Sequence, residues 1–181
     1  MNKPNKLLAI DIGNTTISYG LFSNARLFAY GYVEGSHISS LIKSLNRYEV
    51  NRLFTAVISS VVPKIDPIIR KLCVKRLGIT PFFVNYKNCG IKIKYPKPRQ
   101  VGADRLANAV AGKALYGYPL IILDFGTAIT FDCIGKKGEY TGGIILPGAE
   151  LTANALHEHT AKLPMVNPFT RPAALIGKNT K

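Results

Sequence analysis

Residues 7–17 have the sequence LLAIDIGNTTI, and this stretch decides the fold. Leu7–Ile10 form a short apolar run of the kind that buried strands contain. Asp11 and Gly13 then mark a tight turn, after which apolar residues alternate with small or polar ones through residues 17–21. The pattern predicts a strand, a tight turn and a second strand.

The same pattern occurs again in residues 120–131, which have the sequence LIILDFGTAITF. Asp124 stands there in the place of Asp11. Between the two copies, short apolar runs alternate with segments of helical periodicity, which is typical of an α/β chain. We therefore expect two similar halves that each open with the same hairpin, with a boundary near residues 116–119.

Both turns have the composition of a phosphate-binding loop. Glycine lets the backbone approach a phosphate closely, and the N–H groups of the turn can bind its oxygens. The hydroxyl and amide side chains that could add to this binding are Asn14, Thr15, Thr16 and Thr127. An aspartate supplies charge to hold a cation that neutralises the phosphates.

One such turn is weak evidence, because aspartate and glycine are ordinary turn residues. Its duplication favours a nucleotide held between two halves. The sequence contains neither the P-loop pattern nor Gly-x-Gly-x-x-Gly, which argues against the two commonest alternative nucleotide-binding folds.

A further acidic residue, Asp104, lies at the start of the clearest predicted helix, residues 103–115. It follows residues 87–100, which are rich in Lys, Pro and Gly and which we expect to form an extended, exposed loop. One interpretation of Asp104 is structural, because acids favour helix N-termini. The other is catalytic: Asp104 accepts the proton of an attacking hydroxyl while Arg105 holds an anionic group of the substrate.

The chain has 181 residues, with 24 Lys+Arg against 10 Asp+Glu and a formal net charge of +14. This surplus would attract nucleic acid or anionic metabolites such as ATP. No aromatic–basic RNA-binding motif, zinc finger or basic zipper is present in the sequence, so a nucleic-acid-binding module built on Lys64–Arg105 is the weaker alternative.

Hydropathy and cysteine content exclude two further classes of protein. No apolar stretch approaches the roughly 18 residues of a membrane span, so we expect no membrane association. The three widely spaced cysteines suit neither a disulfide framework nor a zinc site. They indicate reduced thiols in a cytoplasmic protein.

Several segments together resemble the type III pantothenate kinases, which belong to the superfamily of acetate and sugar kinases, actin and heat-shock chaperone ATPases. The segments are IDIGNT (10–15), SSVVP (59–63), GADR (102–105), DFGTA (124–128), GGIILPG (142–148) and TAKLP (160–164). The resemblance runs from about Leu7 to the last residue. It implies a duplicated actin-like, ribonuclease H-like α/β fold with domains at residues 1–117 and 118–181, the second domain being incomplete.

The resemblance implies ATP-dependent phosphorylation of pantothenate, the first step of coenzyme A synthesis. The residues that would bind ATP are Asp11, Ile12, Gly13, Asn14, Thr15, Thr16, Ile17 and Thr127. The residues that would bind pantothenate are Tyr95, Gly102, Ala103, Asp104, Arg105 and Thr180. Asp104 would be the proton acceptor, Asp124 would hold a monovalent cation, potassium or ammonium, and Mg²⁺ would accompany ATP.

The resemblance also implies a homodimer in which the helix after Asp104 completes the active site of the partner. Ala107, Ala111 and Ala114 would permit close approach of two helices there. The chain is shorter than the usual family member, so we expect a truncated second domain. The alternative function is a non-catalytic, nucleotide-binding regulator with the same fold.

Overall fold

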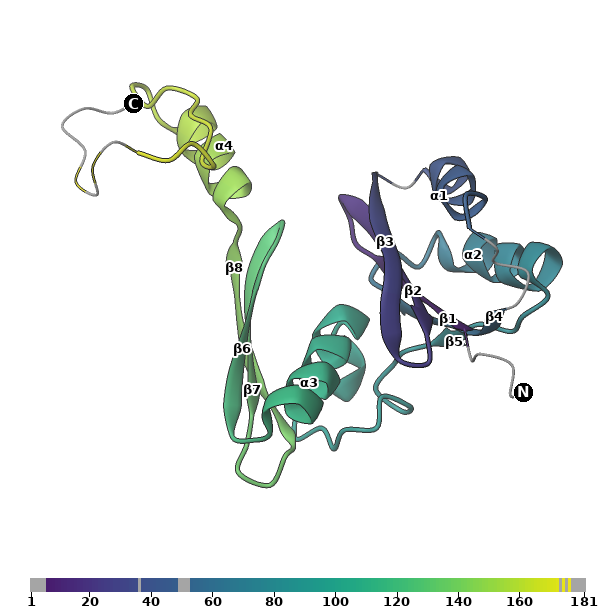
Figure 1. Cartoon of the computed structure of the whole chain (residues 1–181). Helices are drawn as coiled ribbons and strands as arrows, with labels where there is room; N and C mark the ends of the chain where they lie inside the picture. The colour runs from purple at the N-terminus through teal and green to yellow at the C-terminus, as the bar shows by residue number, and fades with distance from the viewer. Residues whose placement is uncertain (1–5, 36, 49–52, 173, 175, 177–181) are drawn as a thin grey trace.

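A computed structural model describes residues 6–35, 37–48, 53–172, 174 and 176 of the chain (Figure 1). The elements in chain order are β1 (Lys6–Ile12), β2 (Thr16–Ser23), β3 (Arg26–Glu34), α1 (Ile38–Leu45), β4 (Leu53–Ser60), α2 (Asp66–Leu72), β5 (Phe82–Phe83), α3 (Ala103–Tyr116), β6 (Leu120–Phe125), β7 (Ala128–Ile134), β8 (Tyr140–Pro147) and α4 (Ala149–His159). A π-helical turn (Cys73–Leu77) continues α2, and a 3₁₀ turn (Pro98–Gln100) precedes α3.

The first sheet has five strands in the order β3-β2-β1-β4-β5. β1 pairs with β2 in the antiparallel sense and with β4 in the parallel sense, which places β1 at the centre. Its apolar residues Leu8, Ile10 and Ile12 are buried, as the sequence predicts. Helices α1 and α2 lie together on one side of this sheet (Figure 1), and their apolar residues join the same core cluster.

The second sheet has three antiparallel strands in the order β6-β7-β8. This meander repeats the arrangement of β1, β2 and β3, since each half opens with a hairpin and adds a third antiparallel strand. The repetition confirms the expected α/β architecture, a duplicated actin-like fold whose second sheet has fewer strands than the first among the described residues.

Helix α3 lies between the two sheets (Figure 1) and contacts β4 of the first as well as β6 and β7 of the second. Leu106 and Ala109 are fully buried in the core cluster that also contains Ile134 and Tyr140. The opposite face of the helix, which includes Ala111 and Ala114, is exposed. The division into domains at residues 1–117 and 118–181 remains a prediction.

The segment before α3, residues 87–100, is mostly exposed, as its composition predicts, but part of it is fixed by backbone pairing. The N–H of Lys94 donates to the carbonyl of Tyr140 at 2.7 Å, and the N–H of Tyr140 donates to the carbonyl of Lys92 at 2.8 Å. The ammonium of Lys94 lies 3.1 Å from the carboxylate of Glu139. Main-chain pairing with the start of β8 therefore holds this segment against the second sheet.

One strand has no counterpart among the elements expected from the sequence. β3 lies at the edge of the first sheet, and its aromatic residues Tyr30 and Tyr32 are largely exposed. Because Ala29 and Val33 are buried on the other face, apolar residues occupy both faces of this strand, and its sequence does not alternate between apolar and polar residues. None of the described helices combines the length and the apolar character that crossing a bilayer requires.

Candidate active site

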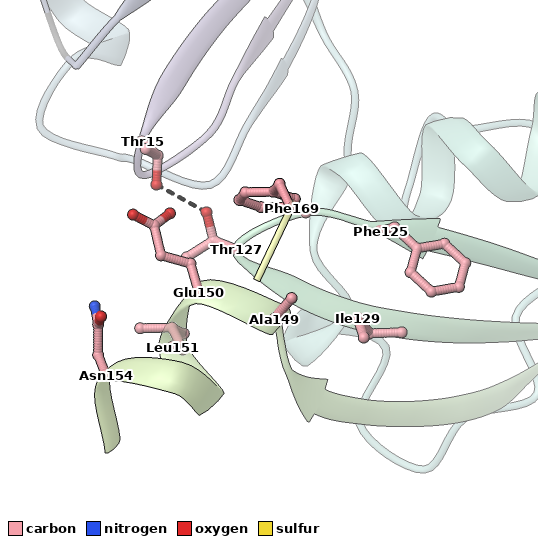
Figure 2. Close-up of a pocket in the computed structure, with 10 residues that line it drawn as sticks. Thr15, Phe125, Thr127, Ile129, Ala149, Glu150, Leu151, Asn154 and Phe169 are labelled. Atoms are coloured by element: carbon pink, nitrogen blue, oxygen red, sulfur yellow. Dashed lines mark hydrogen bonds between the residues drawn. The ribbon is translucent and has the colours of Figure 1, made fainter. Parts of the chain in front are cut away.

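The two hairpin turns meet at their tips, as a nucleotide site shared by two halves requires. The hydroxyl oxygens of Thr15 and Thr127 lie 2.8 Å apart, within hydrogen-bond distance, although 112 positions separate them in the sequence (Figure 2). Each turn is closed by its own backbone: Gly13 donates to the carbonyl of Thr16 at 2.9 Å, and Gly126 donates to the carbonyl of Ala128 at 3.0 Å.

A cavity of about 310 Å³ opens beside this contact. It is lined by Thr15, Phe125, Gly126, Thr127, Ile129, Ala149, Glu150, Leu151, Asn154 and Phe169 (Figure 2). The carboxylate of Glu150 lies toward the two threonine hydroxyls (Figure 2). The lining combines apolar side chains with a few polar groups, which is typical of a small-molecule site.

Gly148 brings α4 close to the second hairpin. Its N–H donates to the carbonyl of Thr127 at 3.0 Å. A Cβ atom at this position would collide with the carbonyl oxygens of Gly126 and Thr127, so only glycine permits this approach. The start of α4 is thereby fixed against the turn that carries Thr127.

A second cavity, of about 420 Å³, gathers the three carboxylates that the sequence singles out. Asp11 comes from the end of β1, Asp124 from β6 and Asp104 from the first turn of α3, and all three line this cavity. Asp11 pairs across the sheet with Ser59 of β4, which also lines it. The fold thus brings together acidic residues from three separate parts of the chain.

Asp11 shows the electrostatic consequence of this gathering. Desolvation by the surrounding protein raises the pKa of its carboxyl above the ordinary value, although solvent still reaches the side chain. The negative charges of Asp104 and Asp124 add to the increase in pKa, and the hydroxyl of Ser59 opposes it. A cation or a positively charged group in the cavity would relieve this repulsion.

Hydrogen bonds orient the other two carboxylates. Oδ1 of Asp104 accepts the N–H of Arg105 at 2.7 Å, an interaction with the free N–H groups of the first helical turn. Oδ2 of Asp124 accepts a hydrogen bond from the side-chain amide of Asn108 at 2.8 Å. Asn108 lies one turn beyond Asp104 on α3, so the same helix positions both carboxylates.

Two of the predicted substrate residues, Arg105 and Tyr95, contact the second sheet. Arg105 is mostly buried and forms an ion pair with Asp132 of β7. The ring of Tyr95 lies against Gly142 of β8, since a Cβ atom there would be 3.6 Å from Tyr95 Cδ2. Gly102 and Ala103 lead into α3, whereas Thr180 lies outside the described residues.

Two of the residues predicted to bind ATP have buried side chains. Ile12 and Ile17 are fully buried in the first core cluster and pair with each other across the hairpin. Any contact they make with a nucleotide must come from the backbone. Asn14 and Thr15 are exposed at the tip of the same turn, and Thr16 is partly exposed.

Sequence reasoning missed Ser59, Asn108 and Asp132. Ser59 belongs to the SSVVP segment, for which no role in the site was predicted, and Asn108 belongs to no recognisable local pattern. Both reach the cavity only through sheet pairing and helix packing. Asp132 had a weak signal: it lies two positions before Ile134 in the same strand and therefore on the buried face. An acid on such a face requires a partner.

The described residues contain no group of three or more His, Cys, Asp or Glu side chains placed to hold a metal ion by themselves. The three carboxylates nevertheless provide the hard oxygen donors that Mg²⁺ and potassium prefer. Mg²⁺ typically takes one or two carboxylates and completes its coordination with water and substrate phosphates. The residues present therefore fit a cation that is shared with a bound phosphate.

The fold and the paired turns define a protein of the actin-like class, in which two similar halves face each other across a cleft. The protein-family model for type III pantothenate kinase matches residues 7–181. The chain belongs to the type III pantothenate kinase family.

Curated relatives and a solved structure agree with this assignment. The chain is 40% identical over 190 residues to the type III pantothenate kinase of Desulfosudis oleivorans and 40% identical over 184 residues to that of Moorella thermoacetica. Each alignment covers 96% of this chain and 72% of the relative. The crystal structure of the ethanolamine utilization protein EutJ from Carboxydothermus hydrogenoformans matches with a TM-score of 0.50 at 16% identity, over 86% of this chain and 57% of that one, which supports the fold alone.

Proposed function

We propose that this protein is a kinase that transfers the terminal phosphoryl group of ATP to the primary hydroxyl of pantothenate, the first step of coenzyme A synthesis. The observation that carries the proposal is the convergence of Asp11, Asp104 and Asp124 on one cavity between the first sheet and α3. Phosphoryl transfer depends mainly on positioning and charge neutralisation, and this arrangement supplies both. Membership of the family identifies the acceptor.

ATP binds with its phosphates between the turns at residues 11–17 and 126–127. Backbone N–H groups and the hydroxyls of Thr15 and Thr127 donate to phosphate oxygens, because both hydroxyls lie at the meeting point of the two halves. The apolar cavity beside this contact, which includes Phe169, suits the rest of the nucleotide.

Asp11 and Asp124 hold the cations that accompany ATP. These carboxylates would hold Mg²⁺, which would neutralise charge on the phosphates, and Asp124 would hold a monovalent cation, potassium or ammonium. The raised pKa of Asp11 supports this assignment, since burial first and then the negative charges of Asp104 and Asp124 disfavour its ionised form, and a bound cation would favour it. Asn108 keeps the carboxylate of Asp124 in place through its 2.8 Å hydrogen bond.

Asp104 accepts the proton of the pantothenate hydroxyl. Its Oδ1 is oriented by the backbone of α3, and the carboxylate lines the cavity that it shares with Asp11 and Asp124. As the hydroxyl oxygen bonds to the terminal phosphorus, the bond from that phosphorus to the bridging oxygen breaks and ADP leaves. Arg105 and Tyr95 bind the far end of pantothenate, with Arg105 pairing with its carboxylate.

The homodimer and the cytoplasmic location also belong to this proposal. The outer face of α3 exposes Val110, Leu115 and Tyr116, an apolar surface that suits contact with a second copy. Cys73, Cys89 and Cys133 are unpaired thiols, which agrees with a reducing compartment. Sedimentation of the purified protein measures the oligomeric state directly.

The test is an assay of the purified protein with ATP, Mg²⁺, potassium and pantothenate, in which ADP release and the mass of the product are measured. We expect phosphopantothenate, and we expect Asp104→Asn to lower kcat by about 1,000-fold while ATP binding is retained. ATP binding without any phosphopantothenate would refute the proposal. A normal kcat in Asp104→Asn would leave Asp104 with only its role at the helix start.

A further inference from the structure

A buried polar cluster lies beside the proposed pantothenate site. Asp132 of β7 is completely buried, and its Oδ1 accepts hydrogen bonds from Nε of Arg105 at 2.8 Å and from the hydroxyl of Tyr140 at 2.7 Å. Nη2 of Arg105 lies 2.7 Å from the same oxygen and donates to the carbonyl of Phe131 at 3.3 Å. The guanidinium is thus bound along one edge.

Stability alone is a poor explanation for this cluster. Removing a carboxylate and a guanidinium from water costs free energy that their attraction often fails to recover. Oδ2 of Asp132 is buried and has no hydrogen-bond partner among the described residues, so the carboxylate is only half satisfied. A pair that contributes little to stability suits a different role, which is to hold a functional side chain in one orientation.

The structure also makes room for the guanidinium. At Gly143 of β8, an added Cβ atom would collide with Phe131 and with Nη2 of Arg105. Glycine at this position therefore allows the guanidinium of Arg105 to approach the backbone of the sheet closely. The neighbouring Gly142 adopts a φ of 125°, which favours glycine, and it contacts the ring of Tyr95.

Tyr140 connects the two proposed substrate residues. Its hydroxyl donates to Asp132, which holds Arg105, while its backbone pairs with Lys92 and Lys94 in the segment that carries Tyr95. Burial and the adjacent carboxylate of Asp132 raise the pKa of Tyr140, so its hydroxyl stays protonated and remains a donor. Tyr140 thus supports both Arg105 and the segment that carries Tyr95.

We propose that Asp132 and Tyr140 are positioning residues. They orient Arg105 so that its remaining nitrogen, Nη1, faces the carboxylate of pantothenate. This inference rests on the proposed function. The recorded bonds of Arg105 use Nε and Nη2 but not Nη1, so a second planar acid can pair there. The negative charge of Asp132 weakens the attraction between Arg105 and the carboxylate of the substrate. Asp132 also fixes the orientation of the guanidinium, and this fixed geometry outweighs the weaker attraction.

The test compares Asp132→Asn and Tyr140→Phe with Thr141→Val as a matched control. Thr141 also lies in β8, and its hydroxyl donates to Cys133 of β7 at 3.0 Å without contacting Arg105. Calorimetry measures the Kd for pantothenate and for an ATP analogue, kinetics separates KM from kcat, and thermal unfolding gives the Tm of each variant.

We expect Asp132→Asn to weaken pantothenate binding by about 10-fold and Tyr140→Phe by about 3-fold, with ATP affinity changed by less than about 2-fold. KM for pantothenate should rise in parallel, kcat should change less, and Thr141→Val should behave as the wild type. In an Arg105→Lys background, Asp132→Asn should add less than about 2-fold, because it acts through Arg105.

Equal or tighter pantothenate binding by a folded Asp132→Asn protein would overturn the inference, as would an undiminished effect in the Arg105→Lys background. If Asp132→Asn does not fold, Tyr140→Phe decides, and unchanged pantothenate binding in it would overturn the inference. A wild-type protein that neither binds nor phosphorylates pantothenate would remove the proposed function and this inference together. That result differs from failure of the inference alone, where wild-type binding is intact.

Discussion

The two hairpin turns have nearly the same sequence pattern but very different surroundings. β1 lies at the centre of a five-stranded sheet, with Leu8 and Ile10 buried. β6 lies at the edge of a three-stranded sheet, where Ile121 is 62% exposed and Phe125 is 73% exposed. The comparison shows that the residues of the turn itself determine its chemistry. The burial of the strand before the turn depends instead on the strands and helices beside it.

The carboxylates of the two turns also differ in how they are held. Asp11 lies beside Ser59 on a parallel neighbour within its own sheet. Asp124 has no second strand on that side among the described residues, and it is held by Asn108 from α3 instead. Equivalent positions in the two halves are therefore supported by a strand in one case and by a helix in the other.

The largest expected effect tests whether the two turns are chemically equivalent. Asp11→Asn and Asp124→Asn should each lower kcat/KM by about 100-fold or more, because each removes a charge that holds a cation at the phosphates. Steady-state kinetics at several Mg²⁺ and potassium concentrations measures the loss.

Glu158→Gln is the control for loss of a carboxylate charge. Glu158 is exposed on α4 and does not line the cavity of the three carboxylates, so activity should change little. A large loss of kcat/KM in only one of the two turn variants would show that the two turns are not chemically equivalent.

The next effect tests the difference in burial. Leu8→Ala should lower the free energy of unfolding by about 3 kcal/mol, because it leaves a cavity in a packed core. Leu123→Ala should cost less than about 1 kcal/mol, since this side chain is 47% exposed. Urea denaturation followed by circular dichroism measures both. Equal costs would show that the apolar face of β6 is covered in solution.

The smallest effect concerns pH and the stability of the first turn. Because the folded state raises the pKa of Asp11, its ionisation opposes folding, and this loss develops as pH rises through the raised pKa. Asp11→Asn should therefore have a slightly higher Tm than the wild type at pH 7, by less than about 2 °C because solvent reaches the carboxylate. Thermal scans from pH 3 to pH 7 measure the difference.

The difference in Tm should shrink toward zero below the ordinary aspartate pKa of about 3.9, where the wild-type carboxyl is protonated in both states. A lower Tm for Asp11→Asn at pH 7, or a difference that does not change with pH, would contradict this account. The matched result for Asp124→Asn would show whether the helix-supported carboxylate behaves in the same way.

Much of the architecture could be predicted from local pattern. The paired turns, the helix that begins at Ala103 and the alternation of strands with helices are all short-range signals, because strand and helix periodicities are set by neighbouring residues. The exposed face of β6 and the edge strand β3 were not predicted. Their burial depends on which strands and helices lie beside them, and single-sequence pattern contains no such information.

The candidate site divides in the same way. Asp11, Asp104 and Asp124 stand out by their place in repeated or helix-initiating motifs, and the structure brings them to one cavity. Asn108 and Asp132 do not stand out in the sequence, since their hydrogen-bond partners lie 16 and 27 positions away in the chain. Residues 87–100 are mostly exposed, as their composition predicts, but composition does not show that Lys92 and Lys94 pair with Tyr140 of the second sheet.

The sequence by itself determined the class of fold and the chemistry of the turns, because a buried strand followed by an Asp-x-Gly turn is a local arrangement that needs few neighbours. Only the tertiary structure decided how these parts cooperate: that Thr15 meets Thr127, that one helix orients the carboxylates of Asp104 and Asp124, and that Asp132 holds Arg105. The physical reason is that these contacts join residues far apart in the chain, and their energies depend on geometry that arises only when the two halves pack together.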